Sequence, residues 1–206
     1  MAETPKLTKE RLDYLIKLVQ QIYLSDNRPW IIGYSGGKDS SCILQLTWYA
    51  LQELDKDQLH KPVYVISSDT LVETPAIVNQ LFHAHIKINE QAQVQELPFE
   101  AHKVQPDISN TFWVNLIGRG YPAPYSNFRW CTDRMKIEPT SHFIKNKVAE
   151  HGEVVILLGA RRSESSTRGQ VMAKRKDVGD RLSRHNELPN AYVFTPIEDW
   201  NTSAVT

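Results

Sequence analysis

The amino-acid sequence predicts an α/β fold in which helices cover both faces of a parallel, twisted sheet. Three observations lead to this prediction. Short apolar runs alternate with longer segments of helical period. The run "EVVILLGA" at 153–160 is almost wholly apolar, as a central parallel strand is. Polar clusters follow several expected strands, where such sheets bind ligands. Because the chain has no repeat, low-complexity tract or clear linker, we expect residues 1–206 to form a single domain.

The first half of the chain is expected to alternate between helices and strands. Apolar side chains recur at helical spacing over residues 8–24, which predicts an amphipathic helix. The apolar runs 30–34 and 62–67 predict buried strands, and segment 39–54 predicts a helix between them. A further helix is expected from Thr74-Pro75 to about residue 96, because proline is favoured in a first helical turn.

The next part of the chain contains a predicted loop between two helices. Residues 100–104 predict a short strand and residues 111–117 a short helix. Residues 118–133, "GRGYPAPYSNFRWCTD", are expected to form a loop because they include two glycines and two prolines. A helix is expected over residues 136–150, ended by Gly152.

The last part of the chain adds the central strand at 153–160, a helix from about Ser163 and a final strand at 191–197. The polar stretch 174–190 has no clear assignment. The polar clusters that follow the strands should converge at one edge of the sheet. These clusters are 35–41, 67–73 and 159–168.

Composition indicates a soluble, cytoplasmic protein. Hydrophobic residues make up 41% of the chain and charged residues 23%, as in globular proteins. No window is apolar over the length that a membrane span needs, and the N-terminus lacks the apolar core of a secretion signal. Two cysteines, Cys42 and Cys131, cannot form a disulfide framework, which favours a reducing compartment.

Charge is balanced overall, with 24 basic and 24 acidic residues, but it is unevenly distributed. Between Arg161 and Arg184 there are eight basic residues and three acidic ones. This excess is a candidate phosphate-facing surface. The alternative interpretation is a solvated basic loop.

The string "SGGKDS" at 35–40 follows the first strand and opens a helix, which predicts an anion site. Gly36 and Gly37 allow close backbone approach, and the amides of a first helical turn favour phosphate. Lys38 adds a positive charge. The string is not a Walker A loop, because Ile32 stands where that pattern needs glycine and Asp39 follows the lysine in place of Ser or Thr.

This string resembles the pyrophosphate-loop (PP-loop) motif of the adenine nucleotide α-hydrolase-like superfamily. The resemblance implies that the chain binds ATP or a related adenylyl nucleotide. It also implies reaction at the α-phosphate, with pyrophosphate as the leaving group where ATP is used.

Further segments together resemble the DndC-like proteins of bacterial DNA phosphorothioation systems, and the related SspD-type proteins remain an alternative. The segments are 67–75, 112–124, 128–139, 157–165 and 184–200. This resemblance implies an ATP pyrophosphatase that activates a DNA backbone phosphate for sulfur insertion. It implies three kinds of partner: DNA, a cysteine desulfurase as sulfur donor, and other phosphorothioation subunits.

The resemblance and the motif assign catalytic roles to Lys38, Asp39 and Arg161. Arg161 would neutralise charge on the phosphoryl group. Asp39 would hold Mg²⁺ or, alternatively, cap the helix. Asp69 and Glu73 could position the nucleotide or the metal, with Glu73 the weaker candidate, and Asp69 could instead cap a turn. Nucleotide contacts are expected from Ser35, Gly36, Gly37, Lys38, Asp39, Ser40, Ser67, Ser68, Asp69, Gly159, Arg161, Arg162 and Arg168.

The resemblance also implies a [4Fe-4S] cluster on four cysteines, one of them Cys131. The other three would follow the stretch ending at Trp200, and the chain holds only one further cysteine, Cys42, which we expect to be a small buried hydrophobe. We expect either that the family's C-terminal part is absent from this sequence or that the protein is a natural variant without the cluster, and we favour the first.

Two other functions remain open at the level of sequence. One is a PAPS or APS reductase, which would release sulfite with thioredoxin and would need a reductive thiol near the C-terminus, where this sequence has none. The other is a nucleotide-sensing assembly subunit. The aromatic residues Trp113, Tyr121 and Trp130 could stack on a nucleobase, but packing is the simpler expectation.

Overall fold

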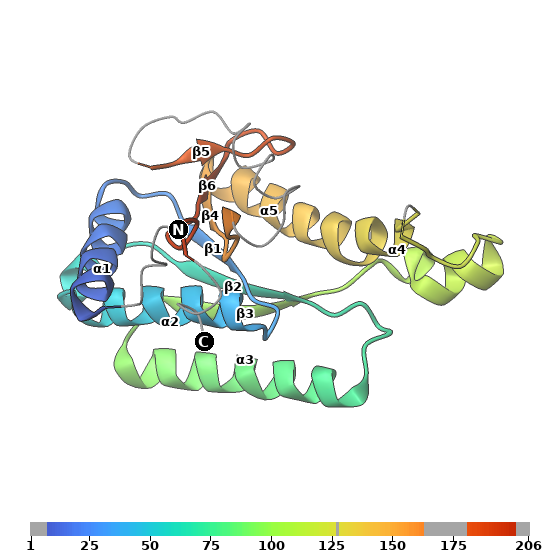
Figure 1. The fold of residues 1–206 in the computed structure, drawn as a ribbon, viewed down its shortest axis with the longest axis horizontal. Coiled ribbons are helices and arrows are strands. Elements are labelled where there is room, and N and C mark those ends of the chain that lie inside the picture. Colours follow the sequence, from blue (N-terminus) through green and yellow to red (C-terminus); the bar gives the residue numbers. More distant parts are fainter. Residues whose placement is uncertain (1–7, 127, 163–180, 201–206) are drawn as a thin grey trace, which may run out of the picture.

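The computed structural model describes residues 8–126, 128–162 and 181–200, and it confirms the predicted α/β fold (Figure 1). Within these residues one sheet has six strands in the order β3-β2-β1-β4-β6-β5. All neighbouring strands are parallel except the antiparallel pair β5 and β6. The strands are β1 (Trp30–Gly33), β2 (Val63–Ser68), β3 (Phe99–Val104), β4 (Val154–Leu157), β5 (Ser183–Arg184) and β6 (Ala191–Phe194).

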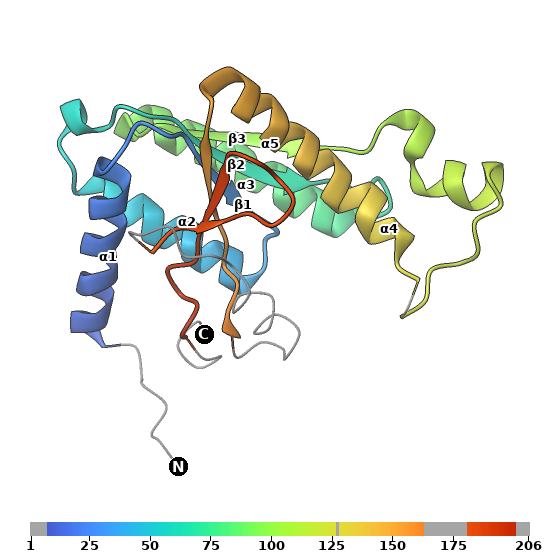
Figure 2. The same cartoon turned by 90° about the horizontal axis from the view of Figure 1, so that it is seen from above.

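Helices cover both faces of the sheet, as predicted (Figures 1 and 2). Helices α1 and α2, together with the inner side of α3, pack on one face, and α5 packs on the other. The helices are α1 (Lys9–Leu24), α2 (Lys38–Gln52), α3 (Pro75–Gln95), α4 (Trp130–Thr132) and α5 (Glu138–His151). Short helical turns are η1 (Lys56–Gln58), η2 (Ile108–Asn110), η3 (Val114–Gly118) and η4 (Asp133–Ile137), of which η3 and η4 are π-helical. Within the described residues, no helix combines the length and apolar character needed to cross a membrane.

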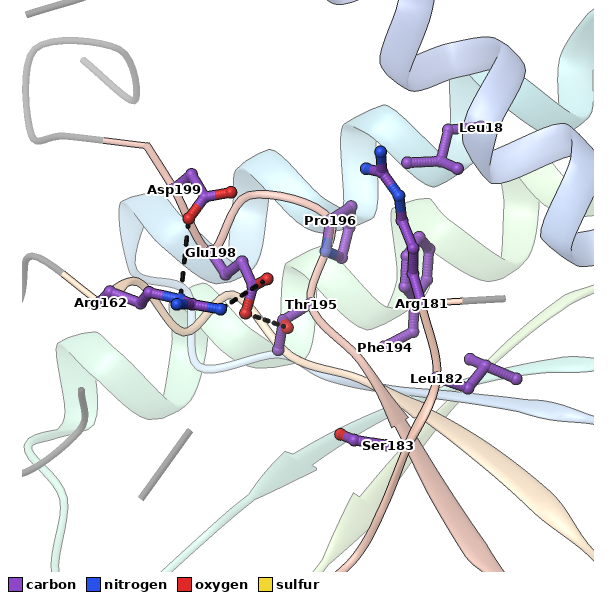
Figure 3. Close-up of a pocket in the computed structure, with 10 residues that line it drawn as sticks. All are labelled: Leu18, Arg162, Arg181, Leu182, Ser183, Phe194, Thr195, Pro196, Glu198 and Asp199. Carbon is purple, nitrogen blue, oxygen red and sulfur yellow. Dashed lines mark hydrogen bonds and ion pairs between the residues drawn. The ribbon is translucent and has the colours of Figure 1, made fainter. Parts of the chain in front are cut away.

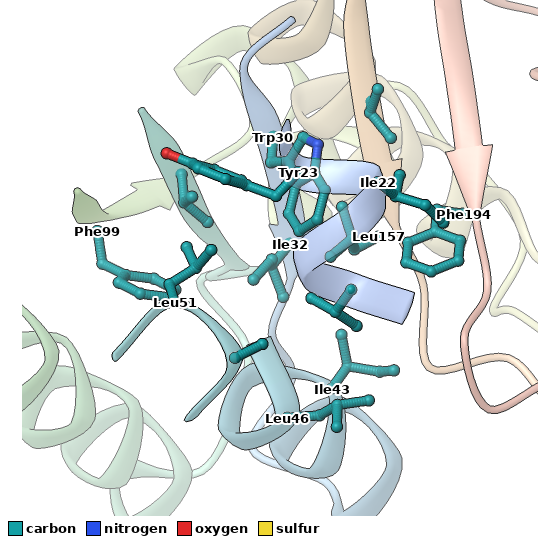
Figure 4. Packing of buried hydrophobic residues seen from close by; sticks show 14 of the residues in the cluster. Ile22, Tyr23, Trp30, Ile32, Ile43, Leu46, Leu51, Phe99, Leu157 and Phe194 are labelled. Carbon is teal, nitrogen blue, oxygen red and sulfur yellow. The ribbon is translucent and has the colours of Figure 1, made fainter. Parts of the chain in front are cut away.

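Strand β1 lies at the centre of the sheet, and its side chains pack into both halves of the core. Its side chains alternate between faces. Trp30 and Ile32 enter the larger cluster beneath α1 and α2 (Figure 4), whereas Ile31 enters the cluster beneath α5. Tyr23 of α1 packs edge-on against Trp30, with ring centroids 5.2 Å apart. The core thus fixes the strand after which the "SGGKDS" string begins.

The predicted ends of several helices agree with the structure. Thr8 caps α1, its hydroxyl accepting a hydrogen bond from the Arg11 amide at 3.3 Å. Helix α3 has Thr74 at its N-cap and begins with Pro75. Gly152 ends α5 with φ of 84°, a left-handed value that glycine adopts without strain.

The predicted loop at 118–133 is wrong at its C-terminal end. A helical run begins at Trp130 and continues through α4, η4 and α5, so Cys131 lies in a helix. At the start of this run Trp130 is buried and stacks on Phe112, with ring centroids 5.3 Å apart. The last strand is also shorter than predicted, and the unassigned stretch supplies β5. The helix expected from Ser163 lies outside the described residues.

Residues 105–126 and 128–137 form an arm that projects beyond the end of the sheet (Figures 1 and 2). The arm has a small core of its own, in which Trp130, Met135 and Asn115 are buried. Tyr121 packs edge-on against Trp130 at 5.4 Å, so both rings are packing residues, as we expected. Trp113 remains 57% exposed.

Candidate functional site

The expected polar clusters meet at the carboxyl edge of the sheet, as far as the structure describes them. The 35–40 loop connects β1 to α2. Its backbone turns at Gly36, where φ is 73°. The Ser40 hydroxyl donates to the Gly37 carbonyl at 2.9 Å and accepts from the Ser35 amide at 3.2 Å. These hydrogen bonds close the loop over the start of α2.

The start of α2 presents positive charge to solvent beside this loop. Gly37 is the N-cap, and the first-turn amides have no preceding helical carbonyl to bind. Together with the helix dipole, they attract an anion. Lys38 is exposed at the same place, and no ion pair of its ammonium group is found in the part of the chain that the structure describes.

The end of β4 approaches the start of α2 so closely that only glycine fits at position 159. A Cβ atom there would lie 2.6 Å from the Asp39 carbonyl oxygen and 2.8 Å from its carbon. Such distances are shorter than any non-bonded contact that a core tolerates. The predicted Gly159 therefore has a packing reason to be glycine, because it brings β4 against the 35–40 loop.

Arg161 and Asp39 form a buried ion pair at this contact. The Arg161 Nε lies 3.0 Å from Asp39 Oδ1, and its Nη2 donates to Oδ2 at 3.2 Å. The Arg161 side chain is 3% exposed and that of Asp39 is 20% exposed. Both carboxylate oxygens of Asp39 face the guanidinium of Arg161. The ion pair therefore competes with Mg²⁺ for the carboxylate that was predicted to hold the metal. It also places the predicted phosphate ligand Arg161 beneath the loop.

A cavity of about 320 Å³ opens beside the loop, between the ends of β1 and β2 and the starts of α3 and α5. Its walls are mainly apolar, with Tyr34, Ile66 and Leu81 among them, and the hydroxyl-bearing side chains of Ser35 and Ser68 also line it. An apolar cavity with a few polar groups suits a small flat ligand such as a nucleobase.

The predicted residues at the end of β2 divide between this cavity and the core. Ser68 lines the cavity and lies 3.3 Å from the Thr140 hydroxyl. Ser67 is buried and its hydroxyl lies 2.8 Å from Nε2 of His85. Burial lowers the pKa of His85, which favours the neutral ring.

Asp69 holds the turn after β2 together. Its carboxylate accepts from the Leu71 amide at 3.0 Å and from the Gln105 side chain at 2.9 Å, and it lies 3.4 Å from the Lys103 ammonium. Burial alone would raise its pKa, but these contacts outweigh burial, so the pKa of Asp69 lies below its ordinary value. This geometry is the turn-capping alternative to a role in metal binding.

Lys136 and Glu73 form an ion pair of 3.2 Å at the rim of the cavity. Glu73 also accepts from the Thr70 hydroxyl at 3.2 Å. Sequence reasoning considered Glu73 but missed Lys136. The available signal was the spacing of Lys136 and Thr140, which puts both on one face of a helix.

Arg162 lies outside this cavity, although it is the next residue after Arg161. It lies 3.2 Å from Glu198 and 3.7 Å from Asp199 (Figure 3). A second cavity, of about 290 Å³, is lined by these three residues beside β6. Because carboxylates pair with Arg162, this part of the predicted basic surface is neutralised. Arg168 lies outside the described residues.

The cysteines do not fit the four-thiolate cluster that the family resemblance implies. Cys42 is half-buried on α2, where burial and the charge of Asp39 raise its thiol pKa. Cys131 lies on α4 in the arm. Two thiols cannot replace four, and no group of three or more His, Cys, Asp or Glu side chains in the described segments is arranged to hold a metal ion.

Comparison with known proteins identifies a family and a fold. A model of the phosphoadenosine phosphosulfate reductase domain matches residues 29–206. An uncharacterized protein of Methanocaldococcus jannaschii is 27% identical over 190 residues, which cover 91% of this chain and 32% of that protein. The chain therefore spans about a third of the length of this curated relative.

Solved structures share the fold at low sequence identity. Phosphoadenylyl-sulfate reductase from Candida auris, in a phosphate complex, is 16% identical with a TM-score of 0.51, over 98% of this chain and 85% of that one. The U34-tRNA thiolase NcsA from Methanococcus maripaludis, with its [4Fe-4S] cluster, is 11% identical with a TM-score of 0.52, over 95% and 61%. The NH3-dependent NAD synthetase from Campylobacter jejuni is 13% identical with a TM-score of 0.52, over 96% and 69%.

Proposed function

The chain belongs to the phosphoadenosine phosphosulfate reductase domain family, and on this basis we propose that it binds ATP and cleaves it between the α- and β-phosphates. The observation that carries the proposal is that the 35–40 loop adjoins the apolar cavity at the carboxyl end of β2. The adenine ring would occupy the cavity, and the loop would hold the β- and γ-phosphates. The structural neighbours named above are enzymes, which agrees with a catalytic role.

In the proposed reaction an acceptor oxygen attacks the α-phosphorus. The bond from this phosphorus to the bridging oxygen breaks, and pyrophosphate leaves with that oxygen. The first-turn amides of α2 and the Lys38 ammonium stabilise the negative charge that develops on the leaving group. Asp39 and Arg161 position the loop through their ion pair. Mg²⁺ would arrive with the triphosphate, and we assign no protein-held position to it.

The acceptor in this proposal is a DNA backbone phosphate that is activated for sulfur insertion. Support comes from the sequence segments that resemble DndC-like proteins, which include the arm. The sulfur would come from a cysteine desulfurase, and other phosphorothioation subunits would complete the system in the cytoplasm.

A second candidate function is reduction of a sulfonucleotide, which the family name favours. A thiolate would attack the sulfur of PAPS or APS and displace the nucleotide, and a second thiol from a thioredoxin-type reductant would then release sulfite. Within this sequence the attacking thiol would have to be Cys131 or Cys42, and the raised pKa of Cys42 disfavours that residue.

Product analysis distinguishes these functions. The protein is incubated with ATP, with and without single- or double-stranded DNA, and pyrophosphate, AMP, ADP and phosphate are measured. We expect pyrophosphate, with the rate reduced about 100-fold in Lys38→Ala. Lys87→Ala, which changes an exposed lysine of α3, is the matched control and should retain activity.

Other outcomes have defined meanings. Phosphate and ADP without pyrophosphate would contradict α–β cleavage, and undiminished turnover by Lys38→Ala would contradict the site. Sulfite released from PAPS in the presence of a dithiol would support the reductase. Nucleotide binding without any turnover would support a nucleotide-sensing assembly subunit.

A further inference from the structure

We propose that Glu73 makes the site select adenine nucleotides whose ribose has a free 3′-hydroxyl, and reject those with a 3′-phosphate. This inference rests on the proposed function, because it takes the cavity of about 320 Å³ beside the 35–40 loop as the place of the nucleoside. It gives Glu73 a part in the choice of substrate, which is separate from the cleavage of the nucleotide.

The turn after β2 brings Glu73 to this cavity in a strained conformation. Leu71 has a φ of 63°, a left-handed value that a bulky side chain adopts only with strain. Its amide donates to the Asp69 carboxylate at 3.0 Å, which holds the turn in this form. Leu71 is 45% exposed, so its own packing does not account for the strain. Strained turns are typical of functional sites, and this one places a carboxylate in the cavity wall.

The Glu73 carboxylate is fixed by two partners that share one of its oxygens. Oε1 accepts a hydrogen bond from the Thr70 hydroxyl at 3.2 Å and lies 3.2 Å from the Lys136 Nζ. The side chain of Glu73 is 27% exposed. Its second oxygen, Oε2, has no hydrogen-bond partner within the described part of the chain. Oε2 is therefore available to accept from a hydroxyl group of a ligand.

The same ion pair balances the charge of the cavity lining. Among the described residues that line the cavity, the charged ones are Glu73 and Lys136. The positive charge that could bind an additional phosphate is therefore neutralised by the carboxylate. The other walls include Ile66, Ile77 and Leu81, and apolar walls of this kind strengthen electrostatic interactions inside the cavity.

A ribose hydroxyl and a ribose phosphate interact with this carboxylate in opposite ways. The ribose joins the base in the cavity to the phosphates at the loop, so its hydroxyls lie at the rim with Glu73. A hydroxyl donates to a carboxylate, whereas a phosphate monoester brings a charge of about −1.5 to −2. Dinucleotide-binding folds use an acidic residue at the ribose 2′-hydroxyl of NAD and an arginine near the 2′-phosphate of NADP.

Solvent ions do not remove this repulsion. The volume of the cavity corresponds to a width of about 7 Å, which is below the Debye length of about 8 Å at physiological salt. A 3′-phosphate at the rim would therefore meet the unscreened charge of Glu73. Lys136 could offset that charge only by leaving the carboxylate with which it is paired.

Two ligands that differ only in the 3′-phosphate test the inference. AMP and adenosine 3′,5′-bisphosphate are titrated into the protein by isothermal titration calorimetry, and the ratio of their dissociation constants is measured. Glu73→Gln removes the negative charge with little change of shape, and Lys136→Met removes the positive charge. Glu90→Gln and Lys87→Met, on the exposed side of α3, are the matched controls. Thermal denaturation reports whether each variant is folded.

We expect the wild type to bind AMP about tenfold more tightly than the bisphosphate. This preference should fall about fivefold in Glu73→Gln, because Lys136 is then free to bind the 3′-phosphate, and it should rise in Lys136→Met. Both control variants should keep the ratio of the wild type. Equal affinity of the wild type for the two ligands, or an unchanged ratio in Glu73→Gln, would overturn the inference.

A third ligand separates failure of the inference from failure of the proposed function. The α,β-methylene analogue of ATP keeps all three phosphates but cannot be cleaved between the first two. If this analogue binds and the ratio of the other two ligands does not depend on Glu73, the nucleotide site stands and only the selection by Glu73 is refuted. If the analogue does not bind the wild type, the proposed nucleotide site is refuted, and the inference with it.

Discussion

At the scale of single residues, the pair of Asp39 and Arg161 makes the sharpest prediction. Removal of one partner from a buried ion pair leaves an uncompensated charge, which costs about 3 kcal/mol or more. Arg161→Met should therefore lower the free energy of unfolding by about this amount. Arg162→Met should change it by less than about 1 kcal/mol, because that side chain is 55% exposed. Urea denaturation measures both.

A double-mutant cycle tests whether the effect belongs to the pair. Asp39→Asn combined with Arg161→Met should cost clearly less than the sum of the two single changes, since the same contact is lost in each. Additive losses would mean that Arg161 stabilises the protein through other neighbours. Equal losses in Arg161→Met and Arg162→Met would contradict the buried pair itself.

The close packing around Gly159 leads to a second prediction, which concerns the stability of Gly159→Ala. In Gly159→Ala the new methyl group would meet the Asp39 carbonyl at 2.6 Å, and backbone must move to relieve this contact. We expect a loss of about 1–3 kcal/mol of unfolding free energy, together with weaker nucleotide binding. Gly118→Ala is the control, because its nearest atom would be 3.9 Å away. Similar stability of the two variants, measured by thermal denaturation, would show that β4 does not approach the loop so closely.

At the scale of elements, the sequence predicted what local patterns determine and missed what distant contacts determine. The helical period of residues 9–24 and the apolar run of β4 are local, and both elements were predicted correctly. The 35–40 loop was also recognised, because its glycines, lysine and serines are consecutive. The helical start at Trp130 was not predicted, because it depends on packing against Phe112, eighteen residues earlier. Lys136 was missed although the predicted helix 136–150 includes it, because its place at the cavity depends on a contact with Glu73, which is distant in the sequence.

The core of the arm contains a buried polar residue, Asn115, and this leads to a prediction about the stability of the arm. Asn115 is fully buried. Its amide donates to the carbonyls of Asn110 and Thr111, each at 2.9 Å, and its oxygen accepts from Arg119 at 3.0 Å. In Asn115→Leu these groups lose their partner, which costs about 1–3 kcal/mol for each buried group that stays unsatisfied.

Because this loss falls on the arm, we expect local rather than global opening. Hydrogen exchange followed by mass spectrometry should show faster exchange over residues 105–126 in Asn115→Leu, with β1 and β4 as protected as before. Asn79→Leu, on the exposed side of α3, should leave both regions unchanged. Uniformly faster exchange across the sheet would mean that the arm and the sheet unfold as one unit.

At the scale of the whole molecule, the candidate site and a buried ion cluster lie at opposite ends of the sheet. The candidate site lies at the carboxyl ends of the strands, whereas an ion cluster lies where β1 and β2 begin. There Lys61, with a side chain 1% exposed, lies 3.0 Å from Asp26, and Arg28 donates to the same carboxylate. Burial alone would raise the pKa of Asp26, but the hydrogen bonds from Arg28 and Lys61 outweigh it, so this pKa lies below its ordinary value of 3.8.

The sign of the resulting pH dependence follows from that shift. A carboxylate whose pKa is lower in the folded state stabilises the fold fully above its unfolded pKa, and this stabilisation is lost as the pH falls through the folded pKa. Between about pH 5 and about pH 3, Asp26→Asn should therefore lose less unfolding free energy than the wild type. Part of the acid loss should remain, because the pKa of Asp69 is lowered as well. Asp13→Asn, on the exposed side of α1, should follow the wild type.

Since Asp26 lies at the end of the sheet away from the loop, the KM for ATP should not change at neutral pH in a variant that is still folded. If Asp26→Asn altered the KM for ATP but lost as much unfolding free energy on acidification as the wild type, this separation of stability from function would be contradicted.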